Sequence, residues 1–139
     1  MQYAIVEGGR GICPPGWHVP TDDEWKILEG AADSQYGISD PVWDLAYGRG
    51  SDVGTNLKAS AGWDNNGNGT DRFGFSGLPG GHRWMDGGTF HGIGLQGFWW
   101  TSTEGFPTSI WRRYLYSDFQ DIDRYYGYDI GISVRCIRD

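Results

Sequence analysis

The sequence marks the start of one helix more clearly than any other element. Thr21 and Glu24 have the T-x-x-E spacing of a capping box, in which each side chain accepts a hydrogen bond from the other residue's backbone N–H group. The two aspartates between them suit the positive end of the helix dipole. Trp25, Leu28 and Ala32 then fall on one helical face. The pattern predicts an amphipathic helix over 21–32, with that face directed at a core.

Elsewhere the pattern favours short elements joined by loops. A second, shorter helix is expected at 40–48, with Asp40 as its cap, Pro41 in its first turn and Gly48 as its stop. Short strands are expected at 2–8, 97–104 and 131–139. The chain between 49 and 97 is dense in Gly, Asn, Asp and Ser, and we expect a long irregular segment there, fixed by Trp63, Phe73, Phe75, Trp84 and Phe90.

The composition fits one domain with an aromatic core. The chain has 139 residues, with eight tryptophans, eight tyrosines and 24 glycines, so we expect a single domain over 1–139 whose core is built on Trp and Phe. Its net charge of −7 argues against a nucleic-acid partner, because nonspecific affinity for nucleic acid comes from cationic side chains. No apolar run approaches the roughly 20 residues of a membrane helix, and the N-terminus has no charged leader before a long apolar stretch. Membrane insertion is not expected.

Two cysteines, Cys13 and Cys136, lie near opposite ends of the chain. A disulfide between them would close almost the whole chain into one loop, which by chain-entropy arguments would stabilise it by something like 4 to 5 kcal/mol. Buried free cysteines are also common. The residues alone leave both states open.

The segment "DNNGNGTD" (64–71) resembles the start of a calcium-binding EF-hand loop. Asp64, Asn66 and Asn68 occupy positions 1, 3 and 5, and Gly69 follows at position 6. Position 12, where a bidentate glutamate is needed, holds Phe75. The segment is therefore either an Asx-rich turn or a site for calcium or another hard cation.

The sequence offers no catalytic constellation. His18, His82 and His91 lack metal-ligand spacing, and no G-x-S-x-G motif or phosphate loop is present. Asp121 and Asp123 could serve as a pair of acid and base, but nothing in the sequence places them in a desolvated pocket. We therefore expect no catalytic residues, no cofactor and no enzyme activity.

The stretch "WRRYLYSDFQDIDRYYGYDIG" (111–131) contains five tyrosines and four aspartates. Tyrosine provides a large amphipathic contact at low entropic cost, and Asp, Ser and Gly provide adaptable polar contacts, as in antibody loops. The stretch is therefore interpreted as an interaction surface, with Trp111 and Leu115 in the core and Arg113 and Arg124 bracing the backbone. The alternative is an aromatic β-meander that covers a small core, which the mixture of Tyr and Asp without clean alternation disfavours.

Four separated pieces together resemble the Fibrobacter succinogenes major paralogous domain of bacterial surface proteins. They are "CPPGWHVPTDDEW", "GLPGG", "GFWWTSTE" and "GISVRCIRD", and the resemblance covers residues 11–139. It implies an α+β, C-type-lectin-like fold of the formylglycine-generating-enzyme branch, with two helices, short antiparallel sheets and long irregular loops. That fold brings the terminal strands side by side, which favours a bridge between Cys13 and Cys136.

The resemblance does not bring an activity with it. Formylglycine-generating enzymes use a pair of active-site cysteines late in the chain, and only Cys136 lies there. The calcium motifs of carbohydrate-binding C-type lectins, Glu-Pro-Asn or Gln-Pro-Asp with Trp-Asn-Asp, are also missing. Neither that enzyme activity nor calcium-dependent sugar binding is expected.

The stretch from 110 to 136 further resembles the variable region of proteins that retroelements diversify in gut Bacteroides and their phages. In that pattern a fixed scaffold alternates with positions templated by AAC codons and randomised at adenine, which cannot yield Lys, Glu, Gln, Trp or Met. The scaffold positions would be Trp111, Arg113, Leu115, Arg124, Gly131, Ser133, Val134 and Arg135. The variable, ligand-binding positions would be Arg112, Tyr114, Tyr116, Asp118, Phe119, Asp123, Tyr125, Tyr126, Gly127, Tyr128, Asp129 and Ile130.

The sequence thus predicts a non-catalytic ligand- or receptor-binding module with a diversified surface at about 110–130. The expected ligand is a protein or glycan on another cell or particle, and the expected location is a virion or a bacterial cell surface. The alternative is an undiversified bacterial adhesin or glycan-binding domain of the same family.

Overall fold

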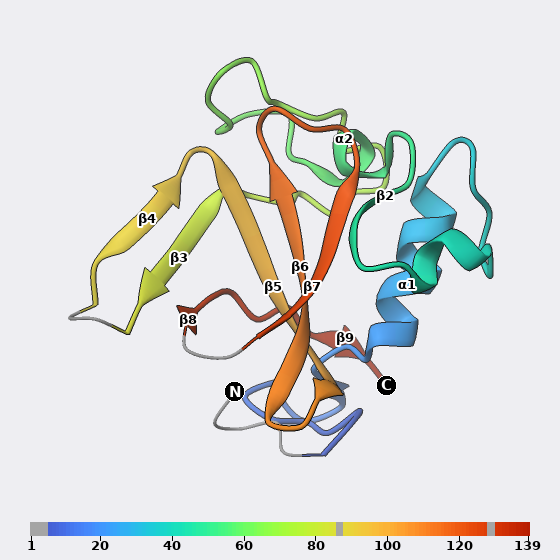
Figure 1. Ribbon diagram of the computed structural model, residues 1–139, viewed down its shortest axis with the longest axis vertical. Helices are drawn as coiled ribbons and strands as arrows, with labels where there is room; N and C mark the ends of the chain where they lie inside the picture. Colours follow the sequence, from blue (N-terminus) through green and yellow to red (C-terminus); the bar gives the residue numbers. More distant parts are fainter. Residues whose placement is uncertain (1–5, 86–87, 128–129) are drawn as a thin grey trace.

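The computed structural model of the chain describes residues 6–85, 88–127 and 130–139. Two α-helices and a 3₁₀ helix combine with short antiparallel sheets, which is an α+β fold (Figure 1). The helices are α1 (Asp22–Ala32), α2 (Val53–Leu57) and the 3₁₀ helix η1 (Pro41–Asp44). The strands are β1 (Trp17–His18), β2 (Tyr47–Arg49), β3 (Gly80–Trp84), β4 (Phe90–Ile93), β5 (Gln96–Phe106), β6 (Ser109–Tyr116), β7 (Ile122–Gly127), β8 (Ile130–Gly131) and β9 (Ile137–Arg138).

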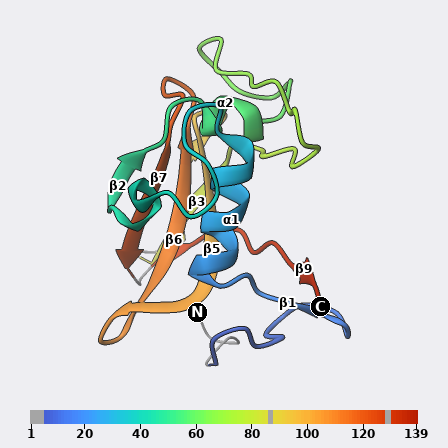
Figure 2. The same cartoon turned by 90° about the vertical axis from the view of Figure 1, so that its right-hand side faces the viewer.

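The central sheet has the strand order β2-β7-β6-β5, and α1 packs against one of its faces (Figure 2). A second sheet, of order β4-β3-β8, stands beside β5, and β1 pairs with β9 where the two ends of the chain meet (Figure 1). The face of the central sheet that α1 covers is called the inner face below, and the opposite face is called the outer face.

Helix α1 begins as the sequence predicts. The Thr21 hydroxyl accepts the Glu24 N–H at 3.2 Å, and the Glu24 carboxylate accepts the Thr21 N–H at 2.8 Å. Trp25 and Ala32 are buried against the sheet. Asp22 and Glu29, on the same side of the helix, are buried as well, which the helical pattern did not indicate.

The predicted second helix is shorter than expected. Asp40 caps it by accepting the Val42 N–H at 2.9 Å, but the chain leaves the 3₁₀ helix after Asp44. Gly48 does not stop a helix, because Tyr47–Arg49 forms strand β2 and pairs with β7. Residues 47–49 form a strand instead of continuing the helix, because the sheet offers them backbone partners that a longer helix could not.

The expected strands are confirmed in part. The strand at 97–104 is present and longer, as β5. Residues 6–8 form a bend and a turn, closed by a hydrogen bond from the Gly9 N–H to the Val6 carbonyl at 2.9 Å, and residues 2–5 lie outside the described part. A single strand over 131–139 is wrong, because this segment pairs in turn with β3, with Trp99 through Ser133, and with β1.

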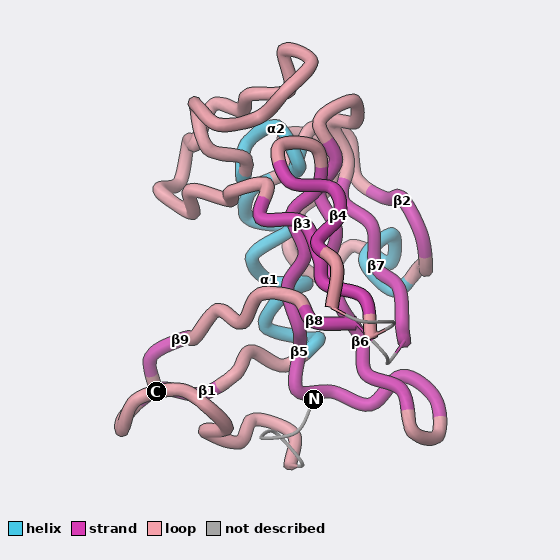
Figure 3. The backbone as a smooth tube through the Cα atoms, turned by 90° about the vertical axis from the view of Figure 1, so that its left-hand side faces the viewer, coloured by secondary structure: helices cyan, strands magenta, loops and turns pink. Residues whose placement is uncertain are grey.

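The segment between 49 and 97 is only partly irregular. It contains α2, β3 and β4, which the sequence analysis missed because their glycine-rich sequences show neither helical nor alternating periodicity. The remainder, between α2 and β3, is loop (Figure 3). Two of the five aromatic residues expected to fix the segment, Trp63 and Phe75, are in the main core.

The stretch 111–131 runs through β6 and β7 and is part of a β-meander. The sequence analysis disfavoured a meander, and that prediction is wrong. Strands β5, β6 and β7 are consecutive antiparallel neighbours, with Arg113 opposite Arg124. Alternation is present, since Arg113 and Leu115 lie on the inner face and Tyr114 lies between them on the outer face. This alternation was not recognisable in the sequence, because the inner face buries arginines as well as apolar residues.

The main core is aromatic, as the composition predicts. It joins α1, η1, α2, the long loop and the inner face of the central sheet. Its buried members are Trp25, Ala32, Trp43, Val53, Leu57, Trp63, Phe75, Trp99, Leu115 and Ile122. Leu115 is thus in the core, whereas Trp111 is only half-buried and packs under the Arg124 guanidinium, whose Cζ lies 3.5 Å from the ring centroid.

A buried network of ion pairs attaches α1 to the inner face. Arg124 makes a bidentate contact with the Asp22 carboxylate at 2.9 and 2.7 Å. Arg113 pairs with Asp22 at 2.7 Å and donates from Nε to Glu29, and Arg49 donates to Glu29 at 2.6 Å. Arg113 also donates to the backbone carbonyl of Asp22, and Arg124 to that of Asp44.

A disulfide joins Cys13 to Cys136 across a sequence separation of 123 residues. Cys13 packs with Val19 in a small apolar cluster, next to the β1–β9 pair. Both ends of the chain are thereby held together, as the resemblance implied.

Removal of this disulfide should cost much of the domain's stability. A loop of this length corresponds to about 4 to 5 kcal/mol of free energy of unfolding, because the crosslink restricts the unfolded chain. Urea unfolding of the oxidised protein and of the Cys13→Ser, Cys136→Ser double variant measures the difference. Adding reductant should destabilise only the wild type, and an equal response in both proteins would contradict the prediction.

The Asp22 ion pairs should make the domain sensitive to acid. Burial alone would raise the pKa of Asp22, but hydrogen bonds from Arg124 and the charge of Arg113 outweigh it and hold the pKa well below its usual 3.8. The pairs therefore stabilise the fold fully above the unfolded-state pKa, and this contribution is lost as the pH falls from about 5 toward the lower folded-state pKa.

Asp22→Asn should lower the free energy of unfolding at pH 7 by about 3 to 5 kcal/mol and flatten its dependence on acidic pH, because buried arginines lose their partner. The matched control is Asp23→Asn in the same helical turn, where the carboxylate is 86% exposed and its removal should cost less than about 1 kcal/mol. Urea unfolding between pH 3 and 7, as a rough range spanning the carboxylate pKa, measures both. Equal slopes for the wild type and Asp22→Asn would contradict the assignment.

Candidate binding surface

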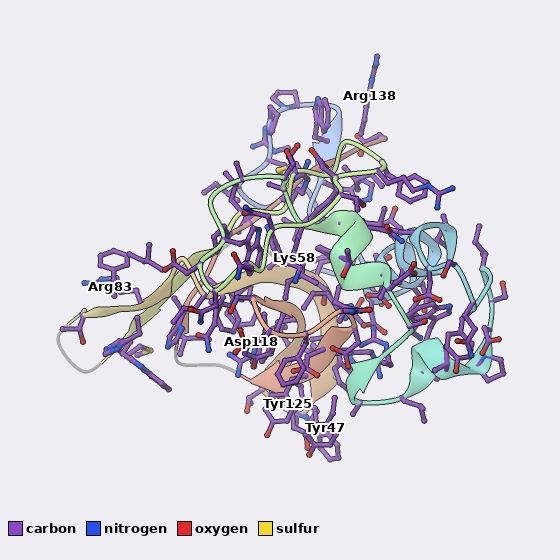
Figure 4. All side chains as sticks on the ribbon, turned by 90° about the horizontal axis from the view of Figure 1, so that it is seen from above. Tyr47, Lys58, Arg83, Asp118, Tyr125 and Arg138 are labelled. Carbon is purple, nitrogen blue, oxygen red and sulfur yellow. A yellow bond between two sulfur atoms is a disulfide. The ribbon has the colours of Figure 1, made fainter. Side chains whose placement is uncertain are left out.

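Aromatic side chains from four strands cover the outer face of the central sheet. Strand register places Phe98 opposite Tyr114, Trp100 opposite Arg112, and Arg112 opposite Tyr125. We define the outer-face patch by its residues, which are Tyr47, Phe98, Trp100, Arg112, Tyr114, Tyr116, Asp123 and Tyr125. Tyr47 and Tyr125 lie together on the side of the molecule opposite Arg138 (Figure 4).

The rings of the patch contact one another in an unbroken series. From the β2 edge inward, the ring centroids of Tyr47 and Tyr125 are 5.5 Å apart, those of Tyr125 and Tyr114 6.4 Å, and those of Tyr114 and Phe98 4.5 Å. The series continues from Phe98 to His82 of the β3–β4 hairpin at 5.1 Å, and from His82 to Trp84 at 5.1 Å. These strands form a rigid support, so the rings need little ordering when a ligand binds.

A branch of the same series reaches the turn between β6 and β7. Tyr114 contacts Tyr116, and Tyr116 contacts Phe119 at 5.8 Å, where Phe119 is 58% exposed. Asp118 lies beside Phe119 in this turn. The turn therefore extends the outer-face patch with one exposed ring and one carboxylate.

A single buried lysine fixes that turn. The Lys58 ammonium donates to the backbone carbonyls of Tyr116, Ser117 and Phe119 at 3.0, 3.3 and 2.9 Å. Burial lowers the pKa of Lys58, although the negative charges of Asp118 and Asp121 act to raise it.

Two half-buried carboxyl groups mark the β2 end of the patch. Burial raises the pKa of both Asp121 and Asp123, and the charge of Asp121 raises that of Asp123 further. Both face Gly48, where a Cβ atom would lie 2.5 Å from an Asp121 oxygen and 3.2 Å from an Asp123 oxygen. Burial also raises the pKa of Tyr114 and Tyr116, so their phenols are neutral hydrogen-bonding groups at pH 7.

Most of the predicted variable residues come together. Six of them lie on the outer face of β6 and β7, namely Arg112, Tyr114, Tyr116, Asp123, Tyr125 and Gly127, and two more, Asp118 and Phe119, lie in the turn. Tyr126 contacts Trp111 and Phe106 at 5.3 and 5.2 Å, and its ring also stacks on that of Tyr125 at 5.2 Å, so it touches the patch from its border. Ile130 pairs with Trp84 in the other sheet, and Tyr128 and Asp129 lie outside the described residues.

Several residues of this surface were missed from the sequence. Phe98 and Trp100 could have been found from the alternation of "GFWWTS", once that run was accepted as a strand. Tyr47 gave no signal, since the sequence analysis placed it within the predicted helix 40–48, whereas it begins strand β2. It is 65% exposed at a φ of +67°, an unfavourable backbone region for a bulky side chain, and such strain is concentrated at functional positions.

The Asx-rich segment is folded as a turn. The Gly67 N–H donates to the Asp64 carbonyl at 2.9 Å, with Asn65 and Asn66 at positive φ. The side-chain oxygen of Asn68 accepts the Trp63 N–H at 3.0 Å. Among the described residues, no group of three or more His, Cys, Asp or Glu side chains is placed to hold a metal ion.

The fold and the patch define a small disulfide-bonded α+β domain with one aromatic face. The sequence model of the Fibrobacter succinogenes major domain matches residues 2–138, so the chain belongs to this family. No curated protein and no solved structure matches the chain. Within the described ranges, no helix is long and apolar enough to cross a membrane.

Proposed function

We propose that this domain is a non-catalytic binding module and that the outer-face patch contacts a protein or glycan ligand on another cell or particle. The observation that carries the proposal is the unbroken series of rings from Tyr47 to Trp84. Tyr47 and Trp84 at the two ends of the series are exposed and Tyr125 is half-buried, whereas Tyr114 and Phe98 between them are buried and support the exposed rings. Aromatic residues clustered at a surface in this way are typical of interaction surfaces. It stands on paired strands, so the rings are held in place before a ligand arrives.

The proposal includes diversification of this surface by a retroelement. Its support is the alternation of β6 and β7, in which Arg113, Leu115 and Arg124 point to the inner face and the tyrosines between them point outward. Substitution at outward positions would leave the ion pairs and the core unchanged. The C-type-lectin-like fold belongs to the same proposal and is supported by the capped helix on the sheet and by the paired ends of the chain.

The proposed location is the surface of a virion or a bacterial cell. The support is the Cys13–Cys136 disulfide, since structural disulfides persist in oxidising environments. A ligand on another cell or particle would meet the patch there.

Removing rings from the patch should abolish binding without loss of fold. Tyr47→Gly removes the ring and relieves the positive-φ strain, so the stability of this variant should equal or exceed that of the wild type. Tyr125→Ala removes the neighbouring ring. Both should weaken binding about tenfold or more, as each tyrosine contributes well over 1 kcal/mol at a typical hot spot. Labelled protein on a glycan array and on a panel of bacterial cells provides the measurement.

The matched control is Phe73→Ala, which removes an exposed ring from the loop between α2 and β3, where its one described ring partner is Arg72. It should bind like the wild type. Binding that survives both tyrosine variants would move the site elsewhere, and a wild type that binds no glycan and no cell in either assay would count against the proposal.

Diversification predicts a distinctive pattern of sequence variation. Sequencing the 3′ end of the gene across a population should show substitutions confined to adenines in the codons of the variable positions, with the codons of Arg113, Leu115 and Arg124 unchanged. Substitutions spread evenly along the gene would contradict diversification and favour an ordinary adhesin or glycan-binding domain of this family.

A further inference from the structure

Arg112 is a buried cation that has no anionic partner among the described residues. Its side chain lies at the centre of the outer face, with the guanidinium carbon 5.9, 5.1 and 5.8 Å from the ring centroids of Trp100, Tyr114 and Tyr125. The residue is 9% exposed. Its Nε and Nη1 atoms are buried and have no hydrogen-bond acceptor.

The other buried arginines have carboxylate partners. Arg49, Arg113 and Arg124 each form an ion pair with Asp22 or Glu29 on the inner face. Arg112 forms none with any carboxylate in the described part of the chain. Aromatic rings stabilise a guanidinium through their faces, but they leave its in-plane N–H donors unsatisfied.

Gly127 leaves room beside this guanidinium. A Cβ atom at position 127 would lie 2.7 Å from Arg112 Nη2 and 2.9 Å from its Cζ. Any side chain there would therefore displace the guanidinium or cover it. With glycine at this position, no side chain of residue 127 stands over Nη2, the Arg112 donor that is not covered.

We propose that Arg112 binds the carboxylate of an acidic sugar, a hydroxylated ring that carries one carboxylate, on the outer face. Hydrogen bonds between a guanidinium and a carboxylate are strong because both groups are charged, and Nη2 is the Arg112 donor that is not covered. The inference rests on the proposed function, because it takes the outer face as the binding face.

The surroundings of Arg112 favour a sugar over an acidic peptide. Tyr47, which is exposed, and Tyr125, which is half-buried, keep ring surface for the apolar C–H face of a sugar, and Asp123 offers its carboxyl group to hydroxyls. Asp121 and Asp123 repel a second anion, and the chain as a whole carries a net charge of −7. One isolated carboxylate fits this arrangement, whereas a run of acidic residues does not.

The test observes the Nε–Hε signal of Arg112 by ¹⁵N NMR, assigned as the signal missing from Arg112→Gln, while sugars are added to the folded protein. Methyl glucuronide should shift the signal with saturation, at least about tenfold more tightly than the neutral methyl glucoside, which is a discrimination of about 1.4 kcal/mol. Arg112→Gln should remove the discrimination while near-ultraviolet circular dichroism stays native. Gly127→Ala keeps the charge, yet should weaken glucuronide binding by displacing the guanidinium.

Arg138→Gln is the matched control, because it removes the same charge from β9 on the opposite side of the molecule and should change nothing (Figure 4). Equal affinity for the two sugars would overturn the proposal, as would no shift with glucuronide at roughly 50 mM, well above the millimolar range of weak ligands. A shift with N-acetylaspartate but not glucuronide would assign the site to a protein ligand instead.

These outcomes are separable from the proposed function. If excess glucuronide and Arg112→Gln leave binding to cells or arrays intact while Tyr47→Gly and Tyr125→Ala abolish it, the outer face is the binding face and Arg112 is not its anion subsite. If glucuronide shifts Arg112 but the tyrosine variants bind cells normally, the subsite exists and the proposed function fails.

Discussion

The buried ion pairs between α1 and the inner face are the interaction on which the rest of the structure depends. Asp22 and Glu29 bring two carboxylates to a helix face that also carries Trp25, and three arginines from β2, β6 and β7 meet them. Each charge is stable there only because the others are present, since a buried charge without its partner is strongly destabilising. The helix, the edge strand β2 and the two central strands are therefore fixed relative to one another by a single cluster.

This cluster also sets the register of β6 and β7. A slip of one residue would turn every side chain of a strand to the other face, which would move Arg113 and Leu115 to the outer face and Tyr114 and Tyr116 to the inner face. The energetic difference between the two registers is large because one of them leaves Asp22 and Glu29 unpaired. The outward direction of the tyrosines is thus decided on the opposite side of the sheet, by residues outside the outer-face patch.

The sequence predicted the elements that local chemistry decides and missed those that distant contacts decide. The capping box placed α1 correctly, and the aromatic composition predicted the nature of the core. Strands β3 and β4 and helix α2 were not found, because their glycine-rich sequences form regular structure only through partners elsewhere in the chain. The surface was recognised from the composition of 111–131, but its separation into two faces required knowing that arginines can be buried. Tyr47 reaches the surface through the pairing of β2 with β7, which nothing in "LAYGRG" encodes.

Lys58 holds the β6–β7 turn through three backbone carbonyl groups and through no side chain of that turn. Carbonyl groups are the same for every amino acid, so the anchor does not depend on which residues stand at positions 118 and 119. The number of residues between Tyr116 and Phe119 does matter, since an inserted or deleted residue would move the acceptors away from the ammonium. The turn can therefore accept a wide range of side chains as long as the number of its residues stays the same. Point substitution keeps that number, whereas insertion changes it.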